Sequence, residues 1–221
     1  LDGEPVVRVR ERSELLINDG TGRFELAPMT HALRRGNRED VPSGAVWVDY
    51  DRDGLVDLWM SQGGLGAPMQ DRLFRNLGNG DFEDVTEAMG LRTAEWQDLA
   101  DLNEARAHTT AWGATVCDLN GDGWPELLAS SYGRAPNHLW QSNMSGGQRV
   151  FENRSLASGY AYDENRDWSG NQFARCFCSA NRDAAECADV PQPDIRCSQQ
   201  NWRHQYDREA FRLGGNSGAT V

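Results

Sequence analysis

Short apolar runs, separated by turns rich in glycine, aspartate and asparagine, recur along the chain. Four of these runs flank two acidic stretches in pairs, at residues 45–48, 58–60, 114–117 and 127–130. They consist of β-branched, aromatic and aliphatic residues, which is typical of buried strands. Each acidic stretch is therefore predicted to be the turn of a β-hairpin.

A second kind of hairpin follows each acidic stretch and also occurs near the N-terminus. Residues 15–25, 71–85 and 137–153 each contain an apolar strand, a turn rich in asparagine or glycine, and an aromatic residue that begins the return strand. Glycine supplies the positive φ that such turns need. One repeating unit is thus hairpin, spacer and hairpin, which predicts four short antiparallel strands.

Units of this kind are predicted to stack. A single four-stranded sheet cannot bury both of its faces, so repeated sheets must pack on one another. Four-stranded antiparallel units that stack in this way are the blades of a β-propeller. The sequence therefore predicts an all-β fold, built as a β-propeller of four-stranded antiparallel blades.

The two acidic stretches, residues 49–57 and 118–126, share the pattern D-x-[DN]-x-D-G-x-x-[DE]. This is the spacing of oxygen ligands around Ca²⁺, with glycine at position six, where the backbone turns sharply, and a backbone carbonyl at position seven. The predicted ligands are Asp49, Asp51, Asp53, Leu55, Asp57, Asp118, Asn120, Asp122, Trp124 and Glu126. Without an ion the carboxylates of each loop would repel one another, so each loop is expected to need one.

The acidic loops have two rival interpretations. An EF-hand begins with a similar acidic run, but it needs a helix on each side and a bidentate glutamate at position twelve, where this chain has Met60 and Ala129. The other rival is a turn rich in aspartate and glycine that holds no metal. Two loops with matching flanks favour calcium over that rival.

In these acidic loops and the N-x-G-x-G-x-F turns that follow, the chain resembles the FG-GAP/VCBS repeat family, the calcium-binding propeller blades also found in the heads of integrin α-subunits. The resemblance covers about residues 12–30, 44–90 and 113–160. It implies a calcium-stabilised propeller module of a secreted or cell-surface protein, with a non-catalytic role in adhesion, in binding an extracellular protein or glycan, or in assembly. The alternative is a propeller domain of an extracellular glycan-active enzyme, a lyase or hydrolase.

The repeats divide the chain into five predicted segments. Residues 1–43 hold the second hairpin of a blade and a linker, residues 44–112 and 113–160 are blades with one calcium loop each, residues 161–212 form an insertion, and residues 213–221 are the first strand of a next blade. A closed propeller needs about four blades or more. The chain is therefore expected to be a partial propeller, whose remaining blades belong to a longer chain or to another chain.

The predicted insertion is rich in cysteine. Cys176, Cys178, Cys187 and Cys197 lie in a polar stretch and are predicted to form two disulfides, with Cys176 and Cys178 bonded to different partners. A zinc site is the alternative, but the usual C-x₂-C knuckle is missing. Disulfides indicate an oxidising, extracellular setting. The pairing itself does not follow from the sequence.

A weaker acidic pattern occurs in the same insertion. Its oxygen-bearing side chains are Asp163, Asn165, Asp167 and Asn171. In this stretch Trp168 replaces the turn glycine. A third calcium site is one interpretation, and an ordinary polar loop is favoured over it.

Charge and the remaining side chains exclude several function classes. The net charge of −12 argues against nucleic acid or an anionic membrane surface as a partner, and no apolar run is long enough for membrane insertion. The four histidines are scattered without a recognisable Ser-His-Asp spacing, so catalysis is not expected. Cys117 is expected to be a small buried residue. Residues 93–106 have apolar positions at helical spacing, which predicts a short helix.

Overall fold

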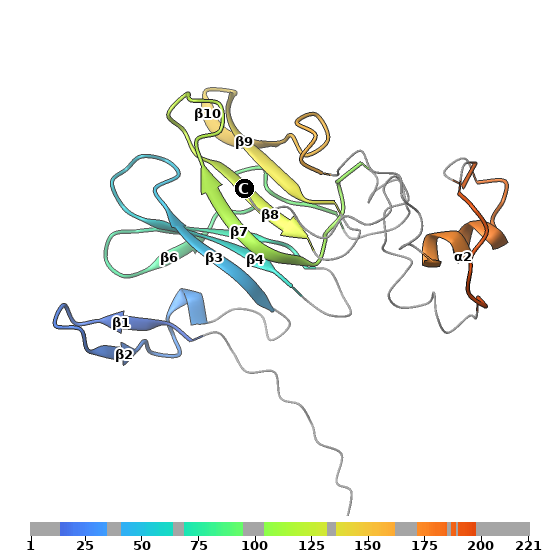
Figure 1. The fold of residues 1–221 in the computed structure, drawn as a ribbon. Coiled ribbons are helices and arrows are strands. Elements are labelled where there is room, and N and C mark those ends of the chain that lie inside the picture. Colours follow the sequence, from blue (N-terminus) through green and yellow to red (C-terminus); the bar gives the residue numbers. More distant parts are fainter. Residues whose placement is uncertain are drawn as a thin grey trace, which may run out of the picture.

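Strands dominate the described part of the chain. The structure is a computed structural model that describes residues 14–34, 41–63, 69–94, 104–131, 136–161, 172–184, 187–188 and 190–197. In these residues the strands form antiparallel sheets of two, four and four strands (Figure 1). The all-β class predicted from the sequence is confirmed.

Two four-stranded meanders make up most of the described fold. Each strand pairs with its neighbours in sequence, in the orders β3-β4-β5-β6 and β7-β8-β9-β10. These strands are β3 (Pro42–Val48), β4 (Asp57–Gln62), β5 (Arg72–Asn76), β6 (Phe82–Asp84), β7 (Ala111–Cys117), β8 (Glu126–Ser131), β9 (His138–Ser145) and β10 (Gln148–Asn153). As predicted, the acidic loops connect β3 to β4 and β7 to β8, and glycine-rich turns connect β5 to β6 and β9 to β10.

A shorter hairpin precedes the two meanders. Its strands are β1 (Leu16–Asn18) and β2 (Phe24–Leu26). Asn18 pairs with Phe24, as Asn76 pairs with Phe82 in β5–β6. The hairpin therefore has the register of the second half of a four-stranded sheet.

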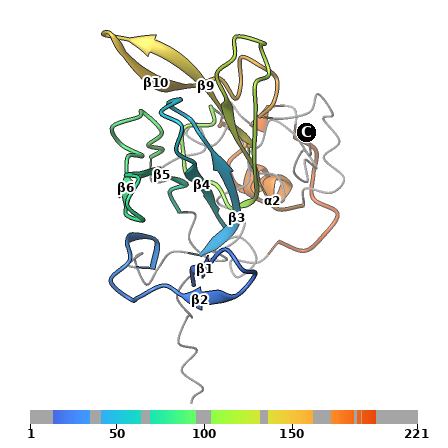
Figure 2. The ribbon, with the colours of Figure 1, turned by 90° about the vertical axis from the view of Figure 1, so that its left-hand side faces the viewer.

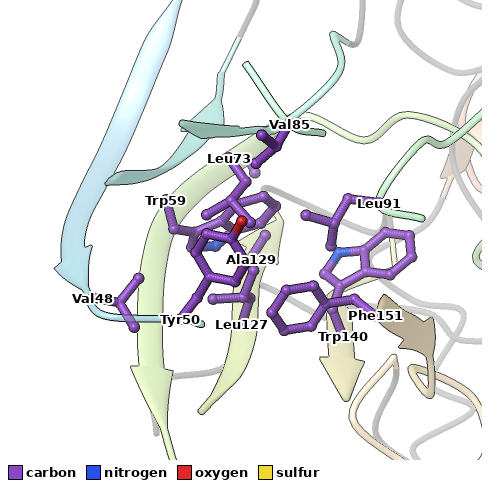
Figure 3. Packing of buried hydrophobic residues seen from close by; sticks show 11 residues of the cluster. Val48, Tyr50, Trp59, Leu73, Val85, Leu91, Leu127, Ala129, Trp140 and Phe151 are labelled. Atoms are coloured by element: carbon purple, nitrogen blue, oxygen red, sulfur yellow. The ribbon is translucent and has the colours of Figure 1, made fainter. Parts of the chain in front are cut away.

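The two four-stranded sheets pack face to face around one hydrophobic cluster (Figure 3). The cluster contains Trp59 and Leu73 of the first sheet and Leu127 of the second sheet, which are fully buried, and Trp140 of the second sheet, which is nearly so. The indole N–H of Trp59 also donates a hydrogen bond of 3.0 Å to the carbonyl of Leu128. The interface is thus held by apolar burial and by a polar contact that fixes the position of one sheet on the other.

The opposite face of the first sheet is covered by the segment around β1 and β2. Leu58 and Phe74 pack against Leu33 of the 3-10 helix η1 (Ala32–Arg34), and Leu15 lies against the same cluster. Successive residues of a strand face opposite sides, so β4 and β5 contribute to both interfaces. The hairpin segment, the first sheet and the second sheet therefore stack in chain order (Figures 1 and 2).

A buried polar side chain makes the same hydrogen bond in each four-stranded sheet. Asp71 Oδ1 accepts the backbone N–H of Gln62 at 2.8 Å, and Asn137 Oδ1 accepts that of Ser131 at 2.8 Å. Both Asp71 and Asn137 are buried. Burial raises the pKa of the Asp71 carboxyl to about 7, whereas Asn137 fills the equivalent place without a charge.

The four cysteines of the predicted insertion form two disulfides. Cys176 bonds to Cys197 and Cys178 bonds to Cys187, so the two neighbouring cysteines do have different partners, as predicted. Cys176 and Cys178 lie on helix α2 (Gln172–Ala180), which the sequence analysis did not foresee. Figure 1 shows α2 to one side of the sheets. Arg175 on α2 also forms a 2.6 Å ion pair with Asp194.

Several expectations concern residues outside the described ranges. These are the acidic pattern of Asp163, Asn165, Asp167 and Asn171 and the predicted strand at residues 213–221. Most of the predicted helix at residues 93–106 also lies outside them. At its two described ends the helix prediction is wrong, because Ala94 forms a parallel β-bridge with Ala107. Among the described helices, none combines the length and apolar character needed to cross a membrane.

His138, at the start of β9, should make the stability of the fold sensitive to acid. Its side chain is fully buried beside the ring of Trp140, and burial, with a smaller contribution from nearby His108, lowers its pKa to about 4. The unfolded chain binds this proton at a pKa near 6.5. As the pH falls from 6.5 to 4, the free energy of unfolding should therefore decrease, by about 3 kcal/mol at pH 4.

The prediction is tested by chemical unfolding of the wild type and of His138→Leu at pH 7 and pH 4.5. The variant should lose less stability on acidification than the wild type. Met144→Leu, at an exposed residue of β9, is the control and should follow the wild type. An unchanged acid response in His138→Leu would contradict the assignment.

Candidate metal centres

The two acidic loops fold by the same set of hydrogen bonds. In the first loop, Asp49 Oδ2 accepts the N–H of Gly54 at 3.1 Å, and Asp53 Oδ1 accepts that of Leu55 at 2.9 Å. Gly54 has a φ of 87°, which a residue with a side chain rarely adopts. Aspartates that accept N–H groups of their own turn hold a tight loop in place.

The second loop repeats this pattern position by position. Asp118 Oδ2 accepts the N–H of Gly123 at 2.8 Å, and Asp122 Oδ1 accepts that of Trp124 at 2.8 Å. The ninth residues also correspond, since Asp57 accepts the N–H of the second loop residue, Tyr50, at 3.1 Å, and Glu126 accepts that of Leu119 at 2.7 Å. The shared sequence pattern therefore corresponds to a shared backbone conformation.

Three carboxylates converge in the first loop. Oxygens of Asp49, Asp51 and Asp57 all lie within 4.8 Å of one another. Asp57 has no exposed surface, and Asp49 Oδ1 is buried without a hydrogen-bond partner among the described residues. A buried acceptor that lacks a donor, beside two further carboxylates, fits the oxygen ligand set of a hard divalent cation.

The electrostatics of both loops favour a cation. The pKa of Asp57 is raised to about 6, mainly by burial and with smaller contributions from Asp51 and Asp53, although two backbone hydrogen bonds lower it. Burial likewise raises the pKa of Glu126, with smaller contributions from Asp122 and Asp118. A bound divalent cation would stabilise the ionised form of each carboxylate.

The second loop brings its side chains together differently. Asn120 Nδ2 donates to Asp122 Oδ2 at 3.1 Å and lies 3.3 Å from Glu126 Oε1. Asn120 Oδ1 accepts the N–H of Asp122 at 2.8 Å, and this oxygen is the atom of the side chain that a calcium ion would bind. Among the described residues, only the first loop gathers three carboxylates within 4.8 Å.

Arg75 on β5 joins the first loop, and the sequence analysis missed it. Its guanidinium forms ion pairs with Asp51 at 2.9 Å and with Asp53 at 3.0 Å. Arg75 thus pairs with one member of the group of three converging carboxylates, Asp51, and with Asp53, which is not in that group. In the second sheet Gln141 takes the place of Arg75, and Asn120 takes that of Asp51. The additional carboxylate of the first loop is thus matched by an additional cation.

Replacement of Arg75 by glutamine should raise the calcium affinity of the first loop by about tenfold, because it removes a positive charge that is paired with two carboxylates of the loop. Without calcium, the variant should be destabilised by less than about 1 kcal/mol, since the ion pairs are partly exposed. Calorimetric titration measures both affinities. Gln141→Arg is the matched reverse change and should lower the calcium affinity of the second loop. A weaker first site in Arg75→Gln would contradict the prediction.

The two loops also contact each other. Arg52 of the first loop lies over the indole of Trp124 in the second loop, with Cζ 4.2 Å from the ring centroid, and Arg149 of β10 stacks on the same indole at 3.5 Å. Gly123 lies against the Arg52 guanidinium, which is the mobile end of a long side chain, so glycine is needed there for its φ of 83°. Cation–π contacts therefore connect the loop ends of the two sheets.

Cys117, next to the second loop, is half-buried, not fully buried as expected. Cys117 is the last residue of β7 and is followed directly by exposed residues of the second loop. Burial, followed by the charges of Glu126 and Asp118, raises the pKa of the thiol. A raised pKa reduces the thiolate fraction, which argues against a nucleophilic role.

Comparison with protein-family models gives no match for this chain, and a search of curated proteins finds no significant match either. The functional interpretation therefore depends on the geometry of the acidic loops and on the internal repeat.

Proposed function

We propose that this chain is a calcium-stabilised β-propeller module in which each four-stranded sheet is a blade. Three features support the proposal: the sheets are meanders of equivalent register, they stack in chain order, and their acidic loops lie side by side through Arg52 and Trp124. Stacked units of this kind bury a continuous core from one sheet to the next.

The observation that carries the calcium assignment is the convergence of Asp49, Asp51 and Asp57, together with a buried oxygen of Asp49 that has no hydrogen-bond partner among the described residues. The role of the ion would be structural. Asp57 is the first residue of β4, and both of its oxygens accept N–H groups, one from Tyr50 and one from Asn76. A cation held by Asp57 would thus fix the acidic loop, β4 and β5 relative to one another.

In this proposal the module belongs to a secreted or cell-surface protein and acts by binding, in adhesion or assembly, with an extracellular protein or glycan as partner. The two disulfides are typical of oxidising compartments. Trp47 and Trp112 expose about half of their surface, at 52% and 56%. Exposed aromatic side chains of this kind favour contacts with protein and glycan partners.

Calorimetric titration of the chelator-treated protein with CaCl₂ tests the calcium assignment. Two equivalents of calcium should bind. Asp57→Asn should remove the first site and leave the second, and Glu126→Gln should do the reverse. Asp81→Asn, at an exposed aspartate in the β5–β6 turn, is the control and should bind as the wild type does. Absence of binding at millimolar calcium would overturn the assignment.

A further inference from the structure

The outer edge of β1 is open within the described part of the chain. β1 pairs with β2, and none of the other described strands pairs with its second edge. Three apolar side chains of this hairpin are half or more exposed, Leu16 at 57%, Phe24 at 61% and Leu26 at 50%. An open edge with exposed apolar side chains is a surface to which a further strand can bind.

The hairpin β1–β2 matches β5–β6 closely enough to identify what such a strand would be. Asn18 Oδ1 accepts the N–H of Gly20 at 2.8 Å, and Asn76 Oδ1 accepts that of Gly78 at 2.9 Å. An equivalent backbone hydrogen bond closes each hairpin. The N–H of Ala27 donates to the carbonyl of Leu15 at 2.8 Å, and the N–H of Val85 donates to the carbonyl of Leu73 at 2.9 Å. The two hairpins therefore present equivalent outer edges.

In the first sheet, β4 covers the outer edge of β5. Leu58 lies opposite Phe74, the residue equivalent to Leu16. The contact is fixed by polar groups at its end: Asn76 N–H donates to Asp57 Oδ1 at 2.8 Å, and Asn76 Nδ2 donates to the carbonyl of Val56 at 2.9 Å. Asn76 thus recognises the acidic residue that ends a calcium loop and the carbonyl before it.

Asn18 presents the same two donors at the open edge. The carbonyl of Leu15 accepts a hydrogen bond from the side of β2. Since the backbone groups of successive residues in a strand point to opposite edges, the N–H and C=O groups of Leu16 and Asn18 point to the open edge. Asn18 Oδ1 accepts a hydrogen bond within its own turn, as Asn76 Oδ1 does. The Nδ2 group of Asn18 is therefore the part of the side chain that can donate to a partner strand. No described residue accepts a hydrogen bond from Asn18 Nδ2.

We propose that the edge of β1 binds the return strand of an acidic-loop hairpin of the β3–β4 type, supplied by a partner polypeptide. The carboxylate that ends the partner's acidic loop accepts the Asn18 N–H, the carbonyl before it accepts the Asn18 Nδ2, and the apolar residue after it lies opposite Leu16. The inference deepens the proposed function, because it rests on the stacking of repeat units in that proposal, and it names the chemistry of the partner.

A synthetic peptide with the sequence of residues 43–63 is the probe. At saturating CaCl₂ it should bind the full chain saturably. Asn18→Asp keeps an oxygen for the Gly20 N–H but replaces the Nδ2 donor by a carboxylate, so binding should weaken by tenfold or more. Leu16→Glu should weaken it similarly. Met144→Glu places a charge at another exposed apolar residue, on β9, and should leave binding unchanged.

Three results would overturn the inference: no saturable binding, equal binding by Asn18→Asp, or a dimer in sedimentation that Asn18→Asp dissociates, which would assign the edge to a second copy of this chain. Calcium titration of the same samples separates this inference from the proposed function. If calcium binds and the peptide does not, only the inference about the β1 edge is contradicted. If the peptide binds and calcium does not, only the calcium assignment is contradicted.

Discussion

Removal of calcium is expected to lower the free energy of unfolding by about 5 kcal/mol, since each of two sites contributes about 2.7 kcal/mol at a free calcium concentration a hundredfold above its Kd. For a chain of this length, such a loss corresponds to a decrease in Tm of roughly 10–20 °C. The physical reason is the buried charge of the ninth loop residues, Asp57 and Glu126, which lie among neighbouring carboxylates. Scanning calorimetry in CaCl₂ and in EDTA measures the difference.

The double variant Asp57→Asn/Glu126→Gln is the control for this experiment. Its amides keep the shape of the side chains but lack their charge, so its melting curve should be the same in CaCl₂ and in EDTA. The variant is compared only with itself in the two buffers, because an amide at residue 57 can accept one of the two N–H groups that Asp57 accepts, and the loss of the other changes its melting temperature in both. A wild-type melting curve that does not respond to EDTA would contradict the prediction.

Replacement of Asp71 by asparagine is expected to stabilise the protein by about 4 kcal/mol at pH 7.5. The pKa of Asp71 is raised to about 7 by burial, so its carboxyl binds a proton more strongly in the folded state than in the unfolded state. The resulting stabilisation is present below the unfolded pKa near 3.9 and is lost as the pH rises through about 7. Asparagine keeps the acceptor for the Gln62 N–H and is never charged.

The second sheet supplies the matched reverse change. Asn137 makes the equivalent hydrogen bond to Ser131, and Asn137→Asp should destabilise the protein at pH 7.5 and should have a smaller effect near pH 4. Urea unfolding of the three proteins between pH 4 and pH 8 tests both changes. If Asp71→Asn lowers stability at pH 7.5, the carboxylate has a favourable partner, and the interpretation of Asp71 as an unneutralised buried charge is wrong.

Much of the strand order could be predicted from the sequence because it is encoded locally. The apolar runs next to Asp49 and Asp118 and the glycine-rich turns after β5 and β9 each specify a hairpin within a few residues. The presence of two disulfides was also predictable, because four cysteines in a short polar stretch without a C-x₂-C knuckle favour disulfides over a zinc site. Their pairing depends on helix α2, which places Cys176 and Cys178 two residues apart on one helix.

The parts that the sequence analysis missed depend on contacts between distant segments. Arg75 reaches Asp51 and Asp53 only because β5 lies beside β4 with a particular register, and no local pattern marks it. A comparison of the two repeats at this position, arginine against glutamine, was the one signal that could have found it. The contact of Arg52 with Trp124 likewise requires two loops that are separated in the chain by the rest of a sheet.

The helix predicted at residues 93–106 illustrates the limit of periodicity. Its apolar residues follow a helical spacing, yet Ala94 pairs with Ala107 as a β-bridge, because the backbone N–H groups of Ala94 and His108 donate to the carbonyls of Arg106 and Ala94 across the segment, both at 2.9 Å. Pairing between its two ends cannot be recognised from side-chain spacing alone.

The most direct test of the calcium assignment is a crystal structure of the protein grown in CaCl₂, with anomalous scattering measured to locate the ions. One peak is expected inside each acidic loop, at about 2.3–2.6 Å from oxygens of Asp57 in the first loop and of Glu126 in the second. Acidic loops without an anomalous peak at saturating calcium would contradict the assignment.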